Sequence, residues 1–265
     1  MDYAILALQM IVLGVSVGIV SAALGVGGGV FMVPAFLQVF SNMDINTAKG
    51  SSLLIIMVVA TMNSVRMNQG KTKSPWNVVI ALASGSIIGG YFGAWVTTLM
   101  SDALVTWLFI GLIAIVSVRM FFIQPKTVLE NQVRRRTTLT IAIGLLSGII
   151  AGATGTGGGA ILVPLVLLAG IASNERVVGL SNTVMVATCA AGMLAHMSGK
   201  PNDDLHLPLT VGLVAASLAP LVILGSLAGA PVGRWLNAHL SLNRRRIVMG
   251  VLLAIIAFRL ILRAT

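Results

Sequence analysis

Two glycine-rich strings, GVGGG at residues 25–29 and GTGGG at residues 155–159, are the part of this chain best suited to chemistry. Each interrupts apolar sequence and precedes a short apolar segment that contains a proline. Consecutive glycines break a helix, and a helix that begins after them presents free N–H groups and its positive dipole end. Such an end is a ready anion site. The primary candidates for binding are therefore Gly27, Gly28, Gly29, Gly157, Gly158 and Gly159.

Close packing of helices through small residues is the alternative interpretation of any membrane glycine. It is the preferred one for the separated glycines Gly89, Gly90 and Gly93. Packing rarely requires three glycines in a row, so the two strings are interpreted as a binding site. Irregular backbone deep in a membrane is tolerated where protein or a water-filled cavity surrounds it.

Hydroxyl and amide side chains follow or flank the two strings at similar places and could donate to a bound anion. Helix capping and hydrogen bonds between helices explain such residues equally well. Their matched placement favours the binding role slightly. The candidates are Ser51, Ser52, Asn63, Thr154, Thr156, Ser181, Asn182 and Thr183.

Charged residues avoid the apolar segments. All seven Asp and Glu residues fall at segment ends or in loops, and Asp44 is interpreted as a solvated loop charge with gating as the alternative. A cation pathway would usually carry a buried carboxylate, so an anionic or neutral substrate is expected, with no evident proton relay. Lys49, Arg66 and His196 stand at predicted segment boundaries. Their first interpretation is interfacial, with the charged head in the polar region, and a role in gating or coupling is the alternative.

No catalytic residue, metal site or cofactor is predicted, because the chain lacks HExxH, GxSxG, GxxxxGK[ST] and paired intramembrane carboxylates. The single cysteine, Cys189, lies within an apolar run and is interpreted as a buried small residue. The net charge of +10 is distributed over separate short loops, which indicates the positive-inside rule and not nucleic-acid binding.

The elements that must position these residues are membrane helices. Hydrophobic residues form 57% of the chain and charged residues 9%, whereas soluble domains carry about 25% charged residues. Long apolar runs such as Leu104–Phe122 approach the roughly 20 residues that a spanning helix needs and lack the alternation of a β-barrel. The sequence therefore predicts an all-α, multi-pass integral membrane protein whose surroundings are a lipid bilayer.

The chain also repeats itself at an offset of 130 residues. GVGGGVFMVPAFL at 25–37 aligns with GTGGGAILVPLVL at 155–167. Two homologous transmembrane halves are predicted, residues 1–125 and 137–265, joined by a basic cytoplasmic linker at 126–136. Together they hold 8–10 membrane helices. The expected apolar segments are 4–24, 29–40, 48–66, 76–99, 103–123, 137–154, 159–172, 177–197, 207–232 and 246–263.

Charge in the loops predicts how the halves are oriented. Basic residues mark 66–75, the linker and 234–246 as cytoplasmic, whereas 196–206, with Lys200 against two aspartates, is predicted external. Equivalent loops thus face opposite sides, which requires an inverted repeat and places both termini outside. The segments 29–40 and 159–172 are short enough to re-enter instead of spanning. Inverted repeats recur in secondary transporters.

The doubled GxGGGxxxVP pattern at 25–34 and 155–164, with AKGSSLLI at 48–55, resembles the sulfite exporter TauE/SafE family of membrane transporters. The resemblance covers essentially the whole chain. It implies alternating-access transport of small, often sulfur-containing anions such as sulfite, thiosulfate, sulfonates or organosulfur acids. It also implies substrate binding at Gly27–Gly29 and Gly157–Gly159, in a bacterial-type inner (cell) membrane. A passive anion channel and a non-transporting membrane scaffold subunit are the alternatives. The transported anion, the direction, the coupling ion and the oligomeric state stay open.

Overall fold

The structure is a computed structural model that describes residues 3–24, 28–40, 42–69, 73–122, 128–130, 133, 136–200, 208–240 and 242–264. Within these residues the chain is almost entirely helical, as predicted. The α-helices are α1 (Tyr3–Leu24), α2 (Gly29–Val39), α3 (Ile45–Asn68), α4 (Trp76–Thr98), α5 (Asp102–Phe122), α6 (Thr137–Thr154), α7 (Gly159–Leu168), α8 (Val177–Met197), α9 (Ala219–His239) and α10 (Leu242–Ala264). A two-residue hairpin, β1 (Thr210–Val211) and β2 (Val214–Ala215), and a short 3₁₀ helix, η2 (Ala216–Leu218), precede α9.

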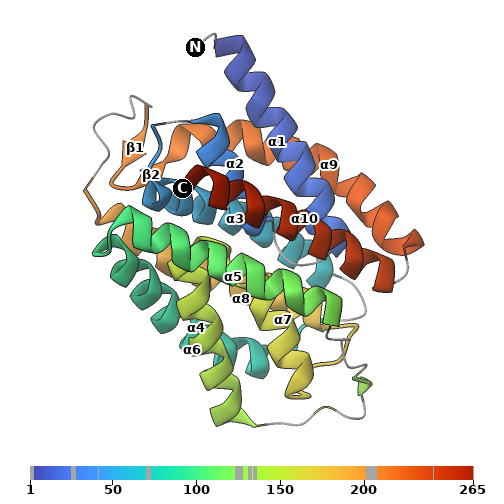
Figure 1. Cartoon of the computed structure of the whole chain (residues 1–265). Coiled ribbons are helices and arrows are strands. Elements are labelled where there is room, and N and C mark those ends of the chain that lie inside the picture. Colours follow the sequence, from blue (N-terminus) through green and yellow to red (C-terminus); the bar gives the residue numbers. More distant parts are fainter. Residues whose placement is uncertain are drawn as a thin grey trace.

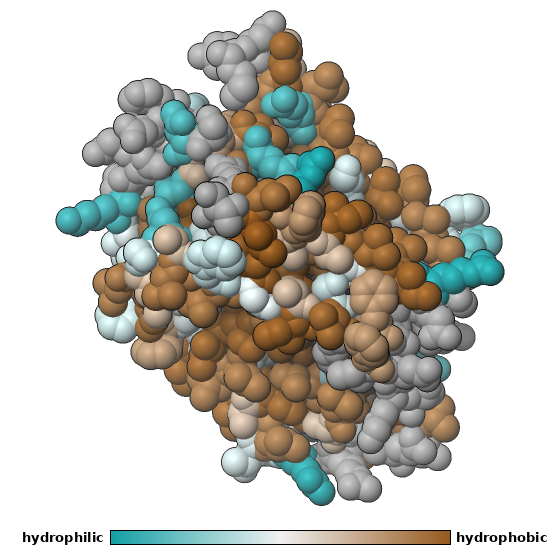
Figure 2. All heavy atoms as spheres, in the orientation of Figure 1, coloured by the Kyte–Doolittle hydropathy of each residue, from teal (hydrophilic) through white to brown (hydrophobic). Residues whose placement is uncertain are grey.

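Six of the described helices are long and apolar enough to cross a membrane: α1, α3, α4, α6, α8 and the α9 region. Hydrophobic side chains cover much of the outer surface of the bundle, and Figure 2 shows them spread across the middle of one face. Ile80, Ile88 and Ile115 are each about two-thirds exposed, which lipid tolerates and water does not. The chain is therefore a multi-pass membrane protein. At about 1.5 Å per residue, α2 and α7 reach roughly half of a 30 Å hydrocarbon layer.

Helices of the two predicted halves are interleaved. In Figure 1, α1 lies along α9, α4 along α6 and α5 along α10, and α3 packs against α8 in the centre. In the order of helices within each predicted half, the pair α1–α9 is the counterpart of the pair α6–α4. Gly50 contacts His196, and Ser64 near the other end of α3 contacts Thr183, so α3 and α8 run antiparallel. In an inverted repeat the equivalent helices of the two halves run antiparallel, as α3 and α8 do. The orientation of the halves in a membrane is still a prediction.

Glycines bring the paired helices into backbone contact. A side chain at Gly18 on α1 would collide with the carbonyl of Ser226 on α9, and one at Gly89 on α4 would collide with the carbonyl of Leu145 on α6. Gly93 faces the backbone of α6 in the same way. Small residues in membranes permit such close approach. The packing interpretation of these separated α4 glycines is therefore correct.

The ninth apolar segment starts later than predicted. Residues 210–215 form the hairpin and not helix, because Gly212 takes a left-handed turn at φ 55° and Pro220 marks the first turn of α9. The hairpin is tied to the central pair: Leu213 N–H donates to the carbonyl of His196 (3.0 Å), and Ala215 N–H donates to Ser51 Oγ (2.9 Å).

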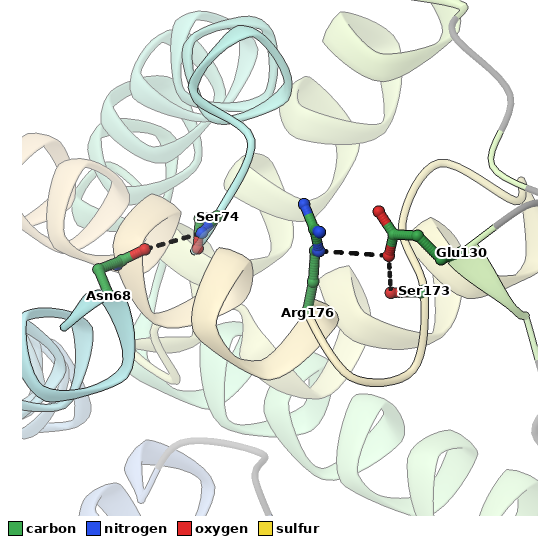
Figure 3. A network of polar contacts seen from close by, with 5 residues as sticks. All are labelled: Asn68, Ser74, Glu130, Ser173 and Arg176. Atoms are coloured by element: carbon green, nitrogen blue, oxygen red, sulfur yellow. Dashed lines mark hydrogen bonds and ion pairs between the residues drawn. The ribbon is translucent and has the colours of Figure 1, made fainter. Parts of the chain in front are cut away.

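Polar contacts fix the loops at one end of the bundle, as Figure 3 shows. Ser74 N–H donates to Asn68 Oδ1 (2.9 Å) and so joins the end of α3 to the start of α4. Arg176 Nε contacts Glu130 Oε2 (3.2 Å), which also accepts from Ser173 Oγ (2.8 Å). The described part of the linker is thereby attached to the loop between α7 and α8.

Candidate functional site

Gly28 and Gly29, the described part of the first glycine string, lie inside the bundle beside the second string. Gly155, Gly157 and Gly158 have positive φ angles of 69°, 77° and 88°, a conformation that glycine adopts without steric cost. A methyl group added at Gly29 would lie 2.7 Å from the carbonyl oxygen of Thr156, so the first string presses on the backbone of the second. Gly27 lies outside the described residues. The glycines thus serve both the turn and the close approach of the two turns.

Each turn ends in the start of a short helix. α2 begins after Gly28 and α7 after Gly158, and neither N-terminus receives a hydrogen bond from a capping side chain. The first N–H groups of a helix have no partner within the helix, and they carry the positive end of its dipole. The two turns therefore bring two helix N-termini into the interior of one bundle.

A small cavity adjoins the first turn, between α1, α2, α3 and α8. Its volume is about 10 Å³, and its polar wall consists of Gly28, Ser21, Asn63 and Asn182. The described lining carries no charged side chain. Gly157 of the second turn lies against Ile56 and Met185, which line the same cavity.

The two asparagines in this wall differ in what they contact. The Asn182 amide donates to the carbonyl of Val178 at 2.9 Å, which leaves its oxygen for other partners. Asn63 makes no side-chain hydrogen bond to a described residue. Among the predicted donors that line this cavity, Asn63 is therefore the one whose amide is not used by a described residue.

Several other predicted donors hold the backbone instead of facing the cavity. Ser52 Oγ donates to the carbonyl of Gly155 (3.0 Å), and the hydroxyls of Thr154 and Thr156 bond to each other (2.9 Å). These contacts fix the second glycine turn. Ser51 Oγ donates to the Thr47 carbonyl (2.7 Å) while it accepts from the hairpin.

The remaining two hydroxyls serve α8 and its neighbour. Thr183 Oγ1 lies 2.7 Å from Ser64 Oγ across the α3–α8 interface, and Ser181 Oγ contacts the sulfur of Met185 (3.8 Å). Capping is the wrong interpretation for the serines of α3. That helix begins at Ile45, where Asp44 accepts from the N–H of Thr47 (2.8 Å). Asp44 is thus a helix cap and not simply a solvated loop charge.

The three candidates for gating or coupling differ in their exposure to solvent. Arg66 is exposed, as an interfacial residue should be. Lys49 and His196 are fully buried, so the interfacial interpretation is wrong for both. Lys49 Nζ donates to Thr97 Oγ1 (2.8 Å) and to the carbonyl of Ala153 (3.1 Å). Neither ring nitrogen of His196 has a hydrogen-bond partner among the described residues, although the backbone of Gly152 lies close by.

A second cavity, of about 240 Å³, lies where α2, α3, α5 and α10 approach one another. Asp44 and Asp102 both line it, together with Thr106 and Trp107. The Asn46 amide donates to Asp102 Oδ1 at 3.2 Å. This acidic cavity was not predicted, because its two carboxylates come from separate loops of the sequence.

Comparison with known proteins decides the family. A sequence model of the family described as Sulfite exporter TauE/SafE matches residues 10–260. The chain belongs to the TauE/SafE family. Relatives named probable membrane transporter proteins are 27% identical over 209 residues in Haemophilus influenzae (77% of each chain) and 21% identical over 267 residues in Methanocaldococcus jannaschii (98% of this chain, 97% of the relative). A third, in Bacillus subtilis, is 25% identical over 280 residues (95% and 96%). No solved structure matches the chain.

For this TauE/SafE protein, symmetry alone would not have found every residue of the small cavity. Ser21 lines it but was not predicted, and the residue at the 130-residue offset is Ala151, which has no donor. The available signal was position, since Ser21 shortly precedes the first glycine string in the sequence. Lys49 likewise has a glycine, Gly179, as its counterpart.

Proposed function

We propose that this TauE/SafE protein is a secondary transporter that moves small anions, sulfur-containing acids such as sulfite, thiosulfate or sulfonates, by alternating access. The observation that carries the proposal is the contact between the two glycine turns beside a cavity lined by neutral hydrogen-bonding groups. Gly28, Asn63 and Asn182 line this cavity, and all three were predicted from the sequence.

The binding chemistry follows from the types of group that surround the turns. Hydrogen bonds to an ionised partner contribute about 1.5–3 kcal/mol each, so a few donors can offset the loss of an anion's hydration. Two helix N-termini add favourable potential for negative charge. A wall without carboxylates does not repel an anion, which distinguishes this site from a cation pathway.

Differences between the two ends of the α3–α8 pair support alternating access. The end near Asn63 and Asn182 borders the small cavity, whereas the end near Gly50 and His196 is covered by the buried hairpin residues Val214 and Ala215. A volume of about 10 Å³ is close to the least that holds one water molecule. An anion with four or more heavy atoms therefore requires the site to widen, as in a carrier that opens to one side at a time.

Flux into proteoliposomes tests this function. We expect saturable uptake of labelled sulfite that unlabelled thiosulfate or a sulfonate inhibits, with faster exchange when unlabelled sulfite is present inside. Uptake that rises linearly with concentration and shows no exchange would favour the passive channel. Absence of flux for sulfite, thiosulfate and sulfonates, by a folded protein that extracts as a stable complex, would favour the scaffold and overturn the proposal.

A further inference from the structure

Lys49 lies in an unusual position for a cation in a membrane protein. Its side chain is fully buried in the first two turns of α3, the helix that Asp44 caps, and it forms no ion pair with a described residue. Its two hydrogen bonds go to neutral acceptors, Thr97 Oγ1 and the Ala153 carbonyl. A buried charge without a paired charge is costly, so such residues mark function by default.

His196 lies across the α3–α8 interface from this lysine. The ring is fully buried, both of its nitrogens lack a partner among the described residues, and its Cβ faces Gly50, the residue after Lys49. Its charge and that of Lys49 would repel each other. Two neighbouring cationic groups in an interior of low dielectric constant cannot both be charged without a large cost in free energy. The pair therefore favours binding a single proton.

Among the described residues, the other charged groups that interact with Lys49 are two carboxylates. Asp44, which caps α3, and Asp102, at the start of α5, both interact electrostatically with Lys49. From α4 and α6 the lysine meets the neutral Thr97 and Ala153. Asp44 and Asp102 also line the 240 Å³ cavity. The two carboxylates that line a cavity large enough for several water molecules thus also interact with the buried amine.

We propose that Lys49 and His196 form a proton-binding centre, supplied through the Asp44–Asp102 cavity, that couples anion movement to protons. This inference rests on the proposed transport function and names its coupling ion. One proton is taken up from cavity water, is held by the amine or the imidazole, and returns to water later in the cycle. A protonated centre offsets the negative charge of the transported anion in the low-dielectric interior.

The geometry favours a proton over a second anion as the ligand of this centre. Neither Lys49 nor His196 lines the small cavity or the acidic cavity, and both are completely excluded from solvent. An anion needs space for several atoms, whereas a proton needs only an accepting lone pair. The carboxylates of the acidic cavity, through which a ligand would reach this centre, would also repel an anion and attract protons.

Hydrogen bonds link this centre to the anion site. The Ala153 carbonyl belongs to the last turn of α6, where carbonyls lack helical partners and a cation is favoured by the dipole. Lys49 also packs against Gly155, whose carbonyl accepts from Ser52. Removing the proton weakens the Lys49 contact with α6 and so alters the support of the second glycine turn.

Two modes of thiosulfate flux test the proposal, because thiosulfate stays fully ionised near neutral pH. Counterflow needs only the anion site, whereas accumulation against a gradient, driven by an imposed pH difference, also needs proton coupling. We expect wild type to perform both. H196Q should keep measurable counterflow and lose pH-driven accumulation. K49M should lose accumulation by a larger factor than counterflow, because it also removes the hydrogen bonds that support the second glycine turn. H239Q, a change at an exposed histidine, should behave as wild type.

Each outcome has a distinct meaning. Accumulation by H196Q and K49M equal to wild type would overturn the proton centre. Loss of counterflow in both variants, with correct folding, would also overturn it and make the pair an anion site. If wild type shows no thiosulfate counterflow, the proposed function fails for that anion, and proton binding is then measured directly.

The direct measurement uses nitrogen-15 labelled histidine, of which the chain has three. The H196Q spectrum identifies the His196 ring signals. We expect these signals to change between pH 5 and 9 in wild type, and the change to disappear or move by at least one pH unit in K49M but not in K73M. His196 signals that stay constant over this range in wild type would overturn the proposal without reference to any transported anion.

Discussion

Asn63 and Asn68 lie less than two turns apart on α3 and have opposite surroundings. Asn63 lines the small cavity and has no side-chain hydrogen bond to a described residue, whereas Asn68 bonds to Ser64 and accepts from the Ser74 N–H. The same substitution at the two sites therefore separates binding from stability.

We expect Asn63→Leu to lower the affinity for sulfite or thiosulfate by about 10- to 100-fold, which corresponds to the loss of one hydrogen bond to an ion. Melting temperature in detergent should stay close to wild type. Asn68→Leu should lower the melting temperature and leave affinity within about threefold in the folded fraction. Unchanged transport kinetics in Asn63→Leu would remove this amide from the site.

Gly158 is constrained by its backbone more than by the space around it. A left-handed residue with a side chain costs about 1–2 kcal/mol, and a branched side chain costs more. We expect Gly158→Val to abolish flux while the protein still inserts, because the strain displaces the start of α7.

Gly28→Val should have the same result for a different reason. Gly28 has a helical φ of −70°, and the added side chain collides with Val17 in the cavity wall. Size-exclusion profiles and flux are measured together for both glycine variants. Normal flux from either inserted variant would mean that the anion binds elsewhere.

At the scale of elements, the α4–α6 and α1–α9 contacts depend on glycines, whose lack of a side chain lets the two backbones touch. Gly89 touches the carbonyl of Leu145, whereas a Cβ at Gly111 on α5 would have no neighbour within 4 Å. The two glycines therefore form a matched pair for testing the packing of helices across the two halves.

We expect Gly89→Leu to separate α4 from α6 and to reduce the yield of folded protein by at least about tenfold, since a clash with backbone cannot be relieved by a side-chain rotation. Gly111→Leu should fold like wild type. The measurement is the amount of monodisperse protein after mild extraction. Equal yields for the two variants would contradict the close α4–α6 packing.

At the scale of the whole molecule, the inverted orientation can be tested with single cysteines. Cys189 is fully buried, so it should react poorly and can be replaced by serine as a background. Lys73 and Lys200 are described, lie outside the helices and follow the equivalent helices α3 and α8.

We expect a membrane-impermeant maleimide added to intact cells to label Lys200→Cys and not Lys73→Cys, with Lys73→Cys labelled after the membrane is opened. The physical reason is the excess of basic residues around Lys73. Labelling of both positions from the same side would exclude an inverted repeat and favour a parallel duplication.

Composition and spacing determined the class of this protein: the helical membrane fold, the positions of the glycine turns and the family follow from local sequence. Tertiary structure decided which side chains face the interior. A membrane helix is apolar toward lipid and toward its neighbours alike, so periodicity does not reveal which face is buried. For this reason Asn63 could be predicted only as a candidate, and Lys49, placed by its neighbours at a boundary, proved to be fully buried. The acidic cavity and the hairpin over His196 likewise depend on residues distant in sequence, whose approach only the packing of the helices fixes.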